Sequence, residues 1–339
     1  MDKWYEKSGA DGDVVISTRI RLARNLSEFP FPCKLQKKGA DAVINLVKEA
    51  VLSSNSQLSS NNFKYIDTQK LDKITLISLV EKHLLSPDFV SDKIEKSLIL
   101  SENESISIMI NEEDHVRLQV MSQGFDLEKT FEIADSLDSL LDEKLSFAFD
   151  DKLGYLTQCP TNLGTGMRAS LMLHLPGLKQ SGVMEKVSAN LLKLGLTMRG
   201  IYGEGSEPQA DMYQLSNQVT LGLSEKTTIN NLKDIAKQII LQERTVRSEM
   251  AKHIETIDFI HRAIGVLKNA RLISTNEFMK LISAVRLGVA LGEIKGVSLD
   301  TINFLMIEAQ PAMLSKFANK DLTAIEKEQK RADLIREIL

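Results

Sequence analysis

In the N-terminal part of the chain, hydrophobic positions follow the period of strands in some segments and the period of helices in others. Strands are predicted at residues 14–21, 63–66, 97–100, 106–110, 116–120, 153–157, 170–175, 196–202 and 212–219. Helices are predicted at residues 40–52, 125–145 and 180–194. One further helix contains Leu71, Ile74 and Leu79, with Asp67 or Thr68 as its N-cap. Residues 106–110 and 116–120 predict a hairpin with one buried face and Asn111–Asp114 at its tip.

From Thr227 onward the hydrophobic spacing is helical throughout. Residues 227–270 read as one nearly unbroken helix, and further helices are predicted at 272–291, 299–308 and 325–339, with Pro311 as a break. We therefore expect two domains. The first, residues 1–254, is an α+β catalytic domain, and the second, residues 255–339, is all-helical. Apolar residues such as Phe278 and Ile282 predict that the helical domain self-associates, with a two-fold dimer as the expected arrangement.

Composition narrows the possible classes of protein. The 339 residues carry a net charge of −4, so nothing in the overall balance points to nucleic acid as a partner. The two cysteines, Cys33 and Cys159, are too few for a disulfide scaffold. The N-terminal segment has no apolar core of a signal peptide, and no apolar run approaches the roughly 18 residues of a membrane span. We expect a cytoplasmic protein with no membrane partner and no metal held by a His/Cys/Asp cage.

Arginines and carboxylates recur where the predicted strands end. The segments are Ser17–Arg21, Asn111–Arg117, Cys159–Arg168 and Arg199–Glu207. In a strand, Arg19 and Arg21 project from one face. The proline and glycines of the Cys159–Arg168 segment force a shaped loop. Exposed backbone N–H groups and guanidinium groups together suit an anion with several oxygens, so this pattern predicts a site that handles phosphate.

Each of these features also has a structural interpretation. A cysteine such as Cys159 is most often a small buried hydrophobe, and its neighbours favour the functional interpretation. Cys33 has no such neighbours and is predicted to be core. Glu112, Glu113 and Asp114 form either a solvated hairpin tip or part of the site. His83 lies near a helix end, where a single histidine is usually structural.

Taken together, the four polar segments resemble the motifs of the phosphagen (guanidino) kinase family, which includes arginine kinase and creatine kinase. The likeness spans roughly residues 10–250, and the Cys-Pro-Thr-Asn-Leu-Gly-Thr run that begins at Cys159 is its most specific part. Within the family the chain resembles the bacterial protein-arginine kinases. Arginine and creatine kinases have an arginine where Tyr202 stands and histidine-threonine where Gly205 and Ser206 stand. The small helical domain that precedes the catalytic domain of those enzymes has no counterpart, and the helical tail matches the bacterial branch.

The resemblance implies a curved antiparallel sheet flanked by helices, followed by the all-helical C-terminal domain. It also implies ATP as phosphoryl donor, with Mg²⁺ held mainly by the phosphates and water. The residues that match nucleotide contacts are Ser17, Thr18, Arg19, Ile20, Arg21, His83, Arg117, Arg168, Ala169, Ser170, Leu171, Met172, Arg199, Gly200, Ile201, Tyr202, Gly203 and Glu204. Glu113 matches the main catalytic carboxylate and Glu204 a second one, on a loop at Gly203–Pro208 expected to close over the site. Cys159, as thiolate, matches the group that pairs with the acceptor guanidinium.

The same resemblance implies that the substrates are proteins with exposed arginines, whose phosphoarginine marks them for the ClpC–ClpP protease, with McsA as activating partner. The branch also carries an Arg-Asp-x-x-Arg-Ala motif in the tail that binds phosphoarginine and stimulates the enzyme. Here Lys327, Glu328, Arg331 and Ala332 occupy the motif positions. Lysine lacks the planar fork of arginine, so a weakened allosteric pocket is predicted, and a plain solvated helix is the alternative. Two other functions stay open, a kinase for free arginine or another small guanidino compound and an inactive adaptor that acts through its helical tail.

Overall fold

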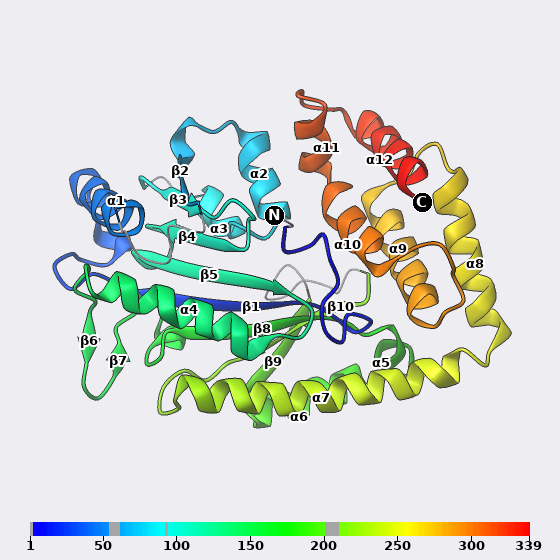
Figure 1. Ribbon diagram of the computed structural model, residues 1–339, viewed down its shortest axis with the longest axis horizontal. Helices are drawn as coiled ribbons and strands as arrows, with labels where there is room; N and C mark the ends of the chain where they lie inside the picture. Colours follow the sequence, from blue (N-terminus) through cyan, green and yellow to red (C-terminus); the bar gives the residue numbers. More distant parts are fainter. Residues whose placement is uncertain (1–2, 54–61, 92–93, 201–209) are drawn as a thin grey trace.

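The computed structural model describes residues 3–53, 62–91, 94–200 and 210–339. An antiparallel sheet forms its centre, with the strand order β2-β3-β4-β5-β1-β8-β10-β9. The strands are β1 (Val15–Arg24), β2 (Lys64–Asp67), β3 (Ser97–Leu100), β4 (Ile106–Ile110), β5 (Val116–Gln123), β8 (Met167–His174), β9 (Leu196–Gly200) and β10 (Met212–Asn217). A small ribbon, β6 (Phe149–Asp150) and β7 (Gly154–Tyr155), stands apart from it (Figure 1).

One face of the sheet carries the main hydrophobic core. Helices α1 (Lys37–Leu52), α4 (Leu127–Asp142) and α7 (Glu225–Met250) bury their apolar sides there. The strands contribute every second residue to the same core, for example Ile20, Leu22, Ala169 and Leu171. Because successive side chains of a strand point to opposite faces, the residues between them, such as Arg19 and Arg21, lie on the other face.

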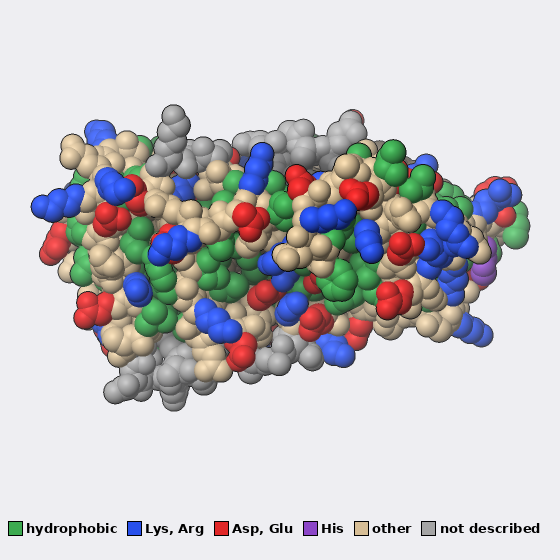
Figure 2. Space-filling view, turned by 90° about the horizontal axis from the view of Figure 1, so that it is seen from above, with side chains coloured by type: hydrophobic (Ala, Val, Ile, Leu, Met, Phe, Trp, Pro, Cys, Tyr) green, Lys and Arg blue, Asp and Glu red, His purple; other side chains and the backbone are tan. Residues whose placement is uncertain are grey.

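The second face of the sheet meets shorter helices and the C-terminal part of the chain. Helices α2 (Lys73–Glu81) and α3 (Pro87–Ser91) pack over β3 to β5, together with the N-terminal aromatic residues Trp4 and Tyr5. The remaining helices of the α+β part are α5 (Pro176–Gln180) and α6 (Met184–Lys193). Basic and acidic side chains are intermixed over the face of the molecule shown in Figure 2.

The C-terminal helices have a core of their own. They are α8 (Ile254–Asn269), α9 (Thr275–Ala290), α10 (Leu299–Glu308), α11 (Pro311–Phe317) and α12 (Ala324–Ile338), gathered at one end of the molecule (Figure 1). Ile260, Phe278, Ile302 and Ile335 meet in this core. Serine or threonine side chains cap α9, α10 and α12, and α12 starts with a full capping box. These polar caps fix where each helix begins.

A buried arginine joins the helical part to the N-terminal segment. Arg286 of α9 is fully buried and donates to Asn303 Oδ1 at 2.5 Å and to the backbone oxygen of Gly12 at 2.5 Å. The apolar residues Ile16 and Met212 of the sheet belong to the same core as α9 and α10. The two parts therefore share a packed interface. The hydrogen bonds of Arg286 offset the cost of burying its charge there.

The structure corrects several predicted elements of the C-terminal half. Residues 227–270 are two helices, with Ala251 as the C-cap of α7 and His253 as the N-cap of α8. The break predicted at Pro311 is present, since α10 ends at Glu308, but Pro311 also begins the further helix α11, because proline at the first helical position loses no hydrogen bond. Among the described residues, no helix is both long and apolar enough to cross a membrane.

Further corrections concern the N-terminal half. The helix predicted to start at Asp67 or Thr68 begins after Asp72, whose Oδ1 accepts the N–H of Thr75 at 2.9 Å. The strand predicted at 153–157 is reduced to β7, and the helix predicted at 180–194 is divided into α5 and α6. The hairpin of β4 and β5 is present, but every residue of β4 is buried, because α2 and α3 cover its second face.

Candidate active site

The polar segments meet at one large cavity on the second face of the sheet. Its volume is about 1090 Å³, and strand, hairpin and loop residues all line it, including Arg21, Glu113, Arg117, Cys159 and Arg168. A neighbouring cavity of about 270 Å³ shares Arg21, Arg117 and Arg168 and adds Arg19 and His83. Arg199 lines both cavities. Segments far apart in the sequence thus form one continuous polar region.

Cross-strand register concentrates the arginines. Arg21 lies directly opposite Arg168 in the pairing of β1 with β8, and Ala23 lies opposite Arg117 in the pairing of β1 with β5. Burial and the neighbouring guanidinium groups of Arg117 and Arg168 lower the pKa of Arg19 to about 10. The pKa of Arg21 is lowered further, for the same reasons. Like charges held this closely in a partly enclosed site favour a polyanionic ligand, which would relieve their repulsion.

The three acids at the hairpin tip have different environments. Glu112 is buried and accepts hydrogen bonds from Arg117 Nη1 at 2.5 Å, Ser86 Oγ at 2.5 Å and the N–H of Glu113 at 2.8 Å. Burial by itself would raise its pKa, but Arg117 and these hydrogen bonds lower the pKa to about 2. Glu112 is therefore an ionised anchor for Arg117 at neutral pH.

Asp114 is not among the residues that line the cavity, and it holds two other segments. Its Oδ1 accepts hydrogen bonds from Asn25 Nδ2 at 2.6 Å and from the N–H of Gln158 at 2.8 Å. The next residue, His115, accepts the N–H of Leu26 at Nδ1, at 3.0 Å. The hairpin tip is thus fixed to the end of β1 and to the residue that precedes Cys159, so it is a buried anchor and not a solvated turn.

Glu113, between these two buried acids, faces the cavity. Asn162 Nδ2 donates to its Oε2 at 3.3 Å, and the thiol of Cys159 also lies within hydrogen-bonding reach of the carboxylate. Burial raises the pKa of Glu113, together with the nearby Asp114 and Glu112, while Arg117 opposes this rise. A carboxylate with a raised pKa is a stronger base than a solvated one, and this one is aimed at the space where a ligand would sit.

The Cys159 loop is shaped by a short 3₁₀ turn, Pro160–Asn162, and by two glycines. The Sγ of Cys159 lies 3.0 Å from Thr161 Oγ1 and its backbone oxygen accepts a hydrogen bond from Thr157 Oγ1 at 2.8 Å. Gly164 has φ +110°, and a Cβ there would collide with the backbone oxygen of Thr220. Gly166, at φ +61°, would collide with the backbone of Ala23. Only glycine permits this close passage of the loop against the sheet.

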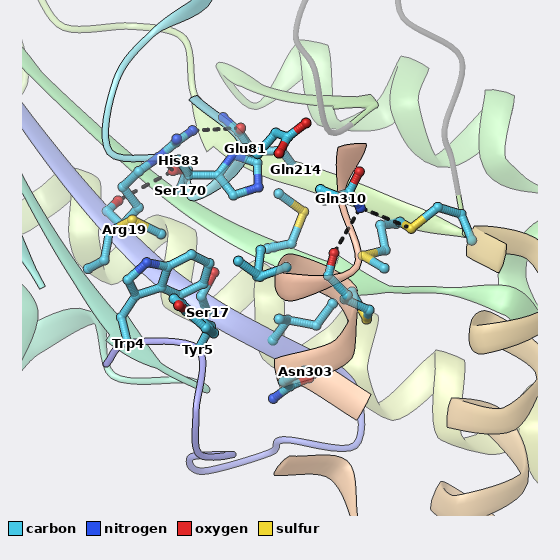
Figure 3. A pocket seen from close by; sticks show the side chains of 17 residues that line it. Trp4, Tyr5, Ser17, Arg19, Glu81, His83, Ser170, Gln214, Asn303 and Gln310 are labelled. Atoms are coloured by element: carbon cyan, nitrogen blue, oxygen red, sulfur yellow. Dashed lines mark hydrogen bonds between the residues drawn. The ribbon is translucent and has the colours of Figure 1, made fainter. Parts of the chain in front are cut away.

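Arg19, Arg21, Arg117 and Arg168 form a row of arginines along the sheet. At the Arg19 end of this arginine row, a small cavity of about 50 Å³ lies between the sheet and the C-terminal helices. Figure 3 shows Trp4 and Tyr5 beside Ser17 and Arg19, with His83, Ser170 and Gln310 also bordering the cavity. The remaining lining side chains are Ile16, Glu81, Met121, Met172, Met212, Gln214, Met279, Asn303, Met306 and Ile307. The cavity is therefore mostly apolar, with polar groups from β1, β8 and β10 at its edge.

Arg19 is held at the boundary between this cavity and the arginine row. Its Nη2 donates to Gln214 Oε1 at 2.8 Å and its Nε to Ser170 Oγ at 3.4 Å. His83 lies beside it in a left-handed backbone conformation, with φ +58°. Burial and then the charge of Arg19 lower the pKa of His83 to about 4, so the imidazole is neutral at pH 7.

Comparison with known proteins shows to which family this chain belongs. Residues 42–246 match the model of a family described as ATP:guanido phosphotransferase, C-terminal catalytic domain. The chain belongs to the ATP:guanido phosphotransferase family. Residues 253–339 also match the model described as the protein-arginine kinase McsB C-terminal domain. As an ATP:guanido phosphotransferase, the chain is an enzyme that uses ATP as phosphoryl donor.

Similar proteins cover the whole length of this guanido phosphotransferase. A protein-arginine kinase of Clostridium acetobutylicum is 43% identical and aligns over 100% of both chains. A protein-arginine kinase of Halothermothrix orenii is 45% identical over 99% of this chain and 96% of its own. Among solved structures, lombricine kinase is 25% identical with a TM-score of 0.61, over 71% of this chain and 69% of that chain. The antiparallel sheet with flanking helices and the helical C-terminal region are the fold that the sequence predicted.

The structure divides the predicted nucleotide contacts into two sets. Ser17, Arg19, His83, Ser170 and Met172 line the small cavity, and Arg21, Arg117, Arg168 and Arg199 line the larger ones. The side chains of Thr18, Ile20, Ala169 and Leu171 face the core on the opposite side of the sheet, and Thr18 Oγ1 donates to Gly124 O at 2.7 Å. Their side chains do not reach the cavities, because alternate residues of a strand face opposite ways.

Other predicted residues lie at or beyond the edge of the described chain. Gly200 is buried at the end of β9, opposite Tyr213 of β10. Ile201, Tyr202, Gly203 and Glu204 lie outside the described residues, as does the rest of the predicted loop through Pro208. Among the described residues, no cluster of three or more histidines, cysteines, aspartates or glutamates could hold a metal ion.

Sequence reasoning misplaced one residue of the large cavity. Cys33 was predicted to be core, but it is exposed and lines the same cavity as Cys159. Cys33 follows four apolar residues, Phe29–Pro32, and this is why it was expected to be buried. The supporting residues Ser86, Asn162 and Gln214 were also missed, because their roles depend on contacts with distant segments.

The predicted tail pocket combines a buried arginine with a surface lysine. Arg331 is fully buried, and its Nε and Nη1 each donate at 2.8 Å to backbone oxygens, of Ala309 and Ile273 respectively. Its buried Nη2 has no hydrogen-bond partner among the described residues. Lys327 pairs with Asp321 at 3.2 Å, and the backbone oxygen of Glu328 accepts the N–H of Ile273 at 3.3 Å. Ala332 belongs to the core of the helical part.

Proposed function

We propose that this guanido phosphotransferase phosphorylates arginine side chains of proteins. The observation that carries the proposal is the convergence of Glu113 and Cys159 with a row of arginines on one cavity. A carboxylate and a thiol suit a guanidinium acceptor, and the arginines suit a triphosphate. The full-length relatives named protein-arginine kinase support a protein acceptor.

In this proposal the nucleotide follows the arginine row. The base contacts Ser17, His83 and Met172 at the edge of the small apolar cavity, and the triphosphate extends past Arg19 towards Arg21 and Arg168. Guanidinium forks hold phosphate oxygens in fixed directions and neutralise the charge that develops during transfer. Arg117, held by Glu112, is oriented before the nucleotide arrives.

The acceptor guanidinium occupies the large cavity beside Glu113. A protonated guanidinium is a poor nucleophile, so one nitrogen must lose a proton as it attacks the γ-phosphorus. Glu113 accepts that proton, the new N–P bond forms, and the bond between the γ-phosphorus and the bridging oxygen breaks to release ADP. Cys159 pairs with another nitrogen of the guanidinium. Glu204, outside the described residues, remains the proposed second carboxylate.

Mg²⁺ is part of this proposal as a companion of the nucleotide. The acid nearest the arginines, Glu112, is already committed to Arg117 and Ser86. The residues present therefore fit an ion held by phosphate oxygens and water, with the arginines around it. When bound, the ion supplies charge neutralisation at the phosphates.

Regulation and partners form a second level of the proposal. We keep the division at residues 254/255, one residue into α8 and directly after the break that separates it from α7. The helical domain is proposed to form a two-fold dimer, McsA and a ClpC-type unfoldase are proposed partners, and ATP supply favours the cytoplasm. The unpartnered Nη2 of Arg331 supports a phosphoarginine pocket, and Lys327 in place of arginine weakens it.

The proposed function is tested by incubating the full chain with ATP and magnesium and either a protein with exposed arginines or free arginine. Acid-labile phosphoarginine on the protein, identified by mass spectrometry, is the expected product, with little transfer to free arginine. Efficient transfer to free arginine alone would make the chain a small-molecule kinase. Loss of ATP turnover with every acceptor, in a correctly folded sample, would favour the adaptor function instead.

A further inference from the structure

Both cysteines of the chain border the same cavity. The sequence contains only Cys33 and Cys159, separated by more than a hundred residues, and both line the 1090 Å³ cavity with Glu113. Cys33 is exposed and Cys159 is partly exposed, so a small oxidant dissolved in water can reach them. Structural cysteines are usually buried and inert, whereas these two are accessible.

The two cysteine segments contact each other directly. The N–H of Cys33 donates to Oε1 of Gln158, the residue immediately before Cys159, at 3.0 Å. This hydrogen bond joins the two segments at Cys33 and at the neighbour of Cys159. A disulfide requires Cα atoms about 5.5 Å apart, and adjacent exposed segments can adjust to that separation.

The hairpin tip fixes both segments in place. On the Cys33 side, His115 Nε2 lies 3.0 Å from the backbone oxygen of Pro30. On the Cys159 side, Asp114 Oδ1 accepts the N–H of Gln158 at 2.8 Å. Since Asp114 and His115 are consecutive residues of one turn, the hairpin tip keeps the two cysteine segments next to each other.

We propose that Cys33 is a resolving cysteine that forms a reversible disulfide with Cys159 when the protein meets hydrogen peroxide. The Cys159 thiolate attacks peroxide, a sulfur–oxygen bond forms, the O–O bond breaks, and hydroxide leaves. The Cys33 thiolate then attacks the sulfenic sulfur, the S–S bond forms, the S–O bond breaks, and the departing hydroxide takes up a proton to give water. Peroxide is the two-electron oxidant and the pair of thiols is the reductant.

The disulfide has a direct consequence for the cavity. It removes the Cys159 thiol from Glu113 and places a covalent link across the space that the acceptor guanidinium needs. Transfer stops while the link exists and returns when a dithiol reduces it. Without Cys33, the sulfenic acid persists and can be oxidised further to the irreversible sulfinic form. Cys33 therefore protects the site as well as closing it.

Peptide mapping of the full-length protein tests the proposal independently of activity. After exposure to peroxide without reductant, tryptic digestion should give residues 25–34 linked to residues 153–168, with the loss of two hydrogens. Dithiothreitol should separate the two peptides, and free thiols should fall from two to none on oxidation. Absence of this linked pair, or an intermolecular or small-thiol adduct in its place, would overturn the proposal whether or not the chain is a protein-arginine kinase.

Activity adds a second measurement, which rests on the proposed function. The wild type should lose at least about tenfold in transfer rate after peroxide and regain it with dithiothreitol. Cys33→Ser, measured relative to its own rate before peroxide, should lose activity at a similar peroxide dose and fail to recover with dithiothreitol. Ser27→Ala, another exposed position on the same connection, is the matched control and should behave like the wild type. Full recovery by Cys33→Ser would contradict the resolving role.

Discussion

The carboxylate of Glu81, the last residue of α2, accepts backbone N–H groups from Ala312 at 2.9 Å and Met313 at 2.8 Å. These donors open α11 in the helical domain, and Glu81 also lines the small cavity near His83. One side chain therefore joins the helical domain to the segment proposed to contact the nucleotide. Burial raises the pKa of Glu81, while the two N–H donors oppose this rise.

We expect Glu81→Ala to loosen this connection. It leaves two N–H groups at the start of α11 without an acceptor, which should lower the free energy of unfolding by about 1–3 kcal/mol. Urea denaturation followed by circular dichroism measures the change, and Lys73→Ala at an exposed position of α2 serves as control. Equal stability of the Glu81 variant and the control would show that the contact does not join the domains.

Replacing Glu113 separates base chemistry from nucleotide binding. Glu113→Gln keeps the shape of the side chain and its contact with Asn162. However, it cannot take the proton from the guanidinium of the substrate. Transfer should fall by about 10²-fold or more, with nucleotide affinity nearly unchanged. Quantitative mass spectrometry of phosphoarginine and calorimetry with ADP measure the two effects. Glu28→Gln, at an exposed position, is the control. A near-normal transfer rate in the Glu113 variant would show that Glu113 is not the base.

Arg168 should matter to both binding and transfer. It lies opposite Arg21 in the register of β1 and β8, so its removal breaks the centre of the arginine row. Arg168→Ala should weaken nucleotide binding and reduce transfer together, and Arg168→Lys should recover only part of each because lysine lacks the planar fork. Arg271→Ala, exposed and distant in sequence, controls for loss of charge. Wild-type affinity and rate in Arg168→Ala would make the residue structural.

The lowered pKa of Glu112 predicts that the folded protein loses stability at low pH. Its pKa is about 2 in the folded protein and near its ordinary value of 4.5 when unfolded. The stabilisation it provides is therefore complete above pH 4.5 and is lost as the pH falls from there towards 2. Chemical denaturation at several pH values should show a steeper acid loss for the wild type than for Glu112→Gln. Parallel pH profiles for the two proteins would contradict the ion pair with Arg117.

The tail pocket gives a gain-of-affinity test. Lys327→Arg restores a planar guanidinium four residues before the buried Arg331, and it should bind free phosphoarginine more tightly than the natural chain. Isothermal titration calorimetry measures the difference, and Lys330→Arg on the exposed side of α12 is the control. Tight binding by the natural sequence, abolished by Arg331→Ala, would show that lysine does not weaken the pocket.

Much of the fold could be predicted because its signals are local. The alternation in residues 14–21 assigns Arg19 and Arg21 to one face and Ile20 to the other, and β1 has that arrangement. The same rule places the side chains of Ala169 and Leu171 in the core. Helix ends were less accurate, because a cap such as Asp72 or a proline such as Pro311 can start one helix or end another.

The sequence by itself determined which residue types and motifs are available, and through them the guanido phosphotransferase family. Only the tertiary structure decided which of the three tip acids stays available to a ligand in the cavity. Glu112 and Asp114 are taken by Arg117 and Asn25, from different strands or segments, and Glu113 is left beside Cys159. It also decided that Cys33 is exposed on that same cavity. Strand register and loop packing set these contacts over long sequence separations, and periodicity within one segment carries no information about them.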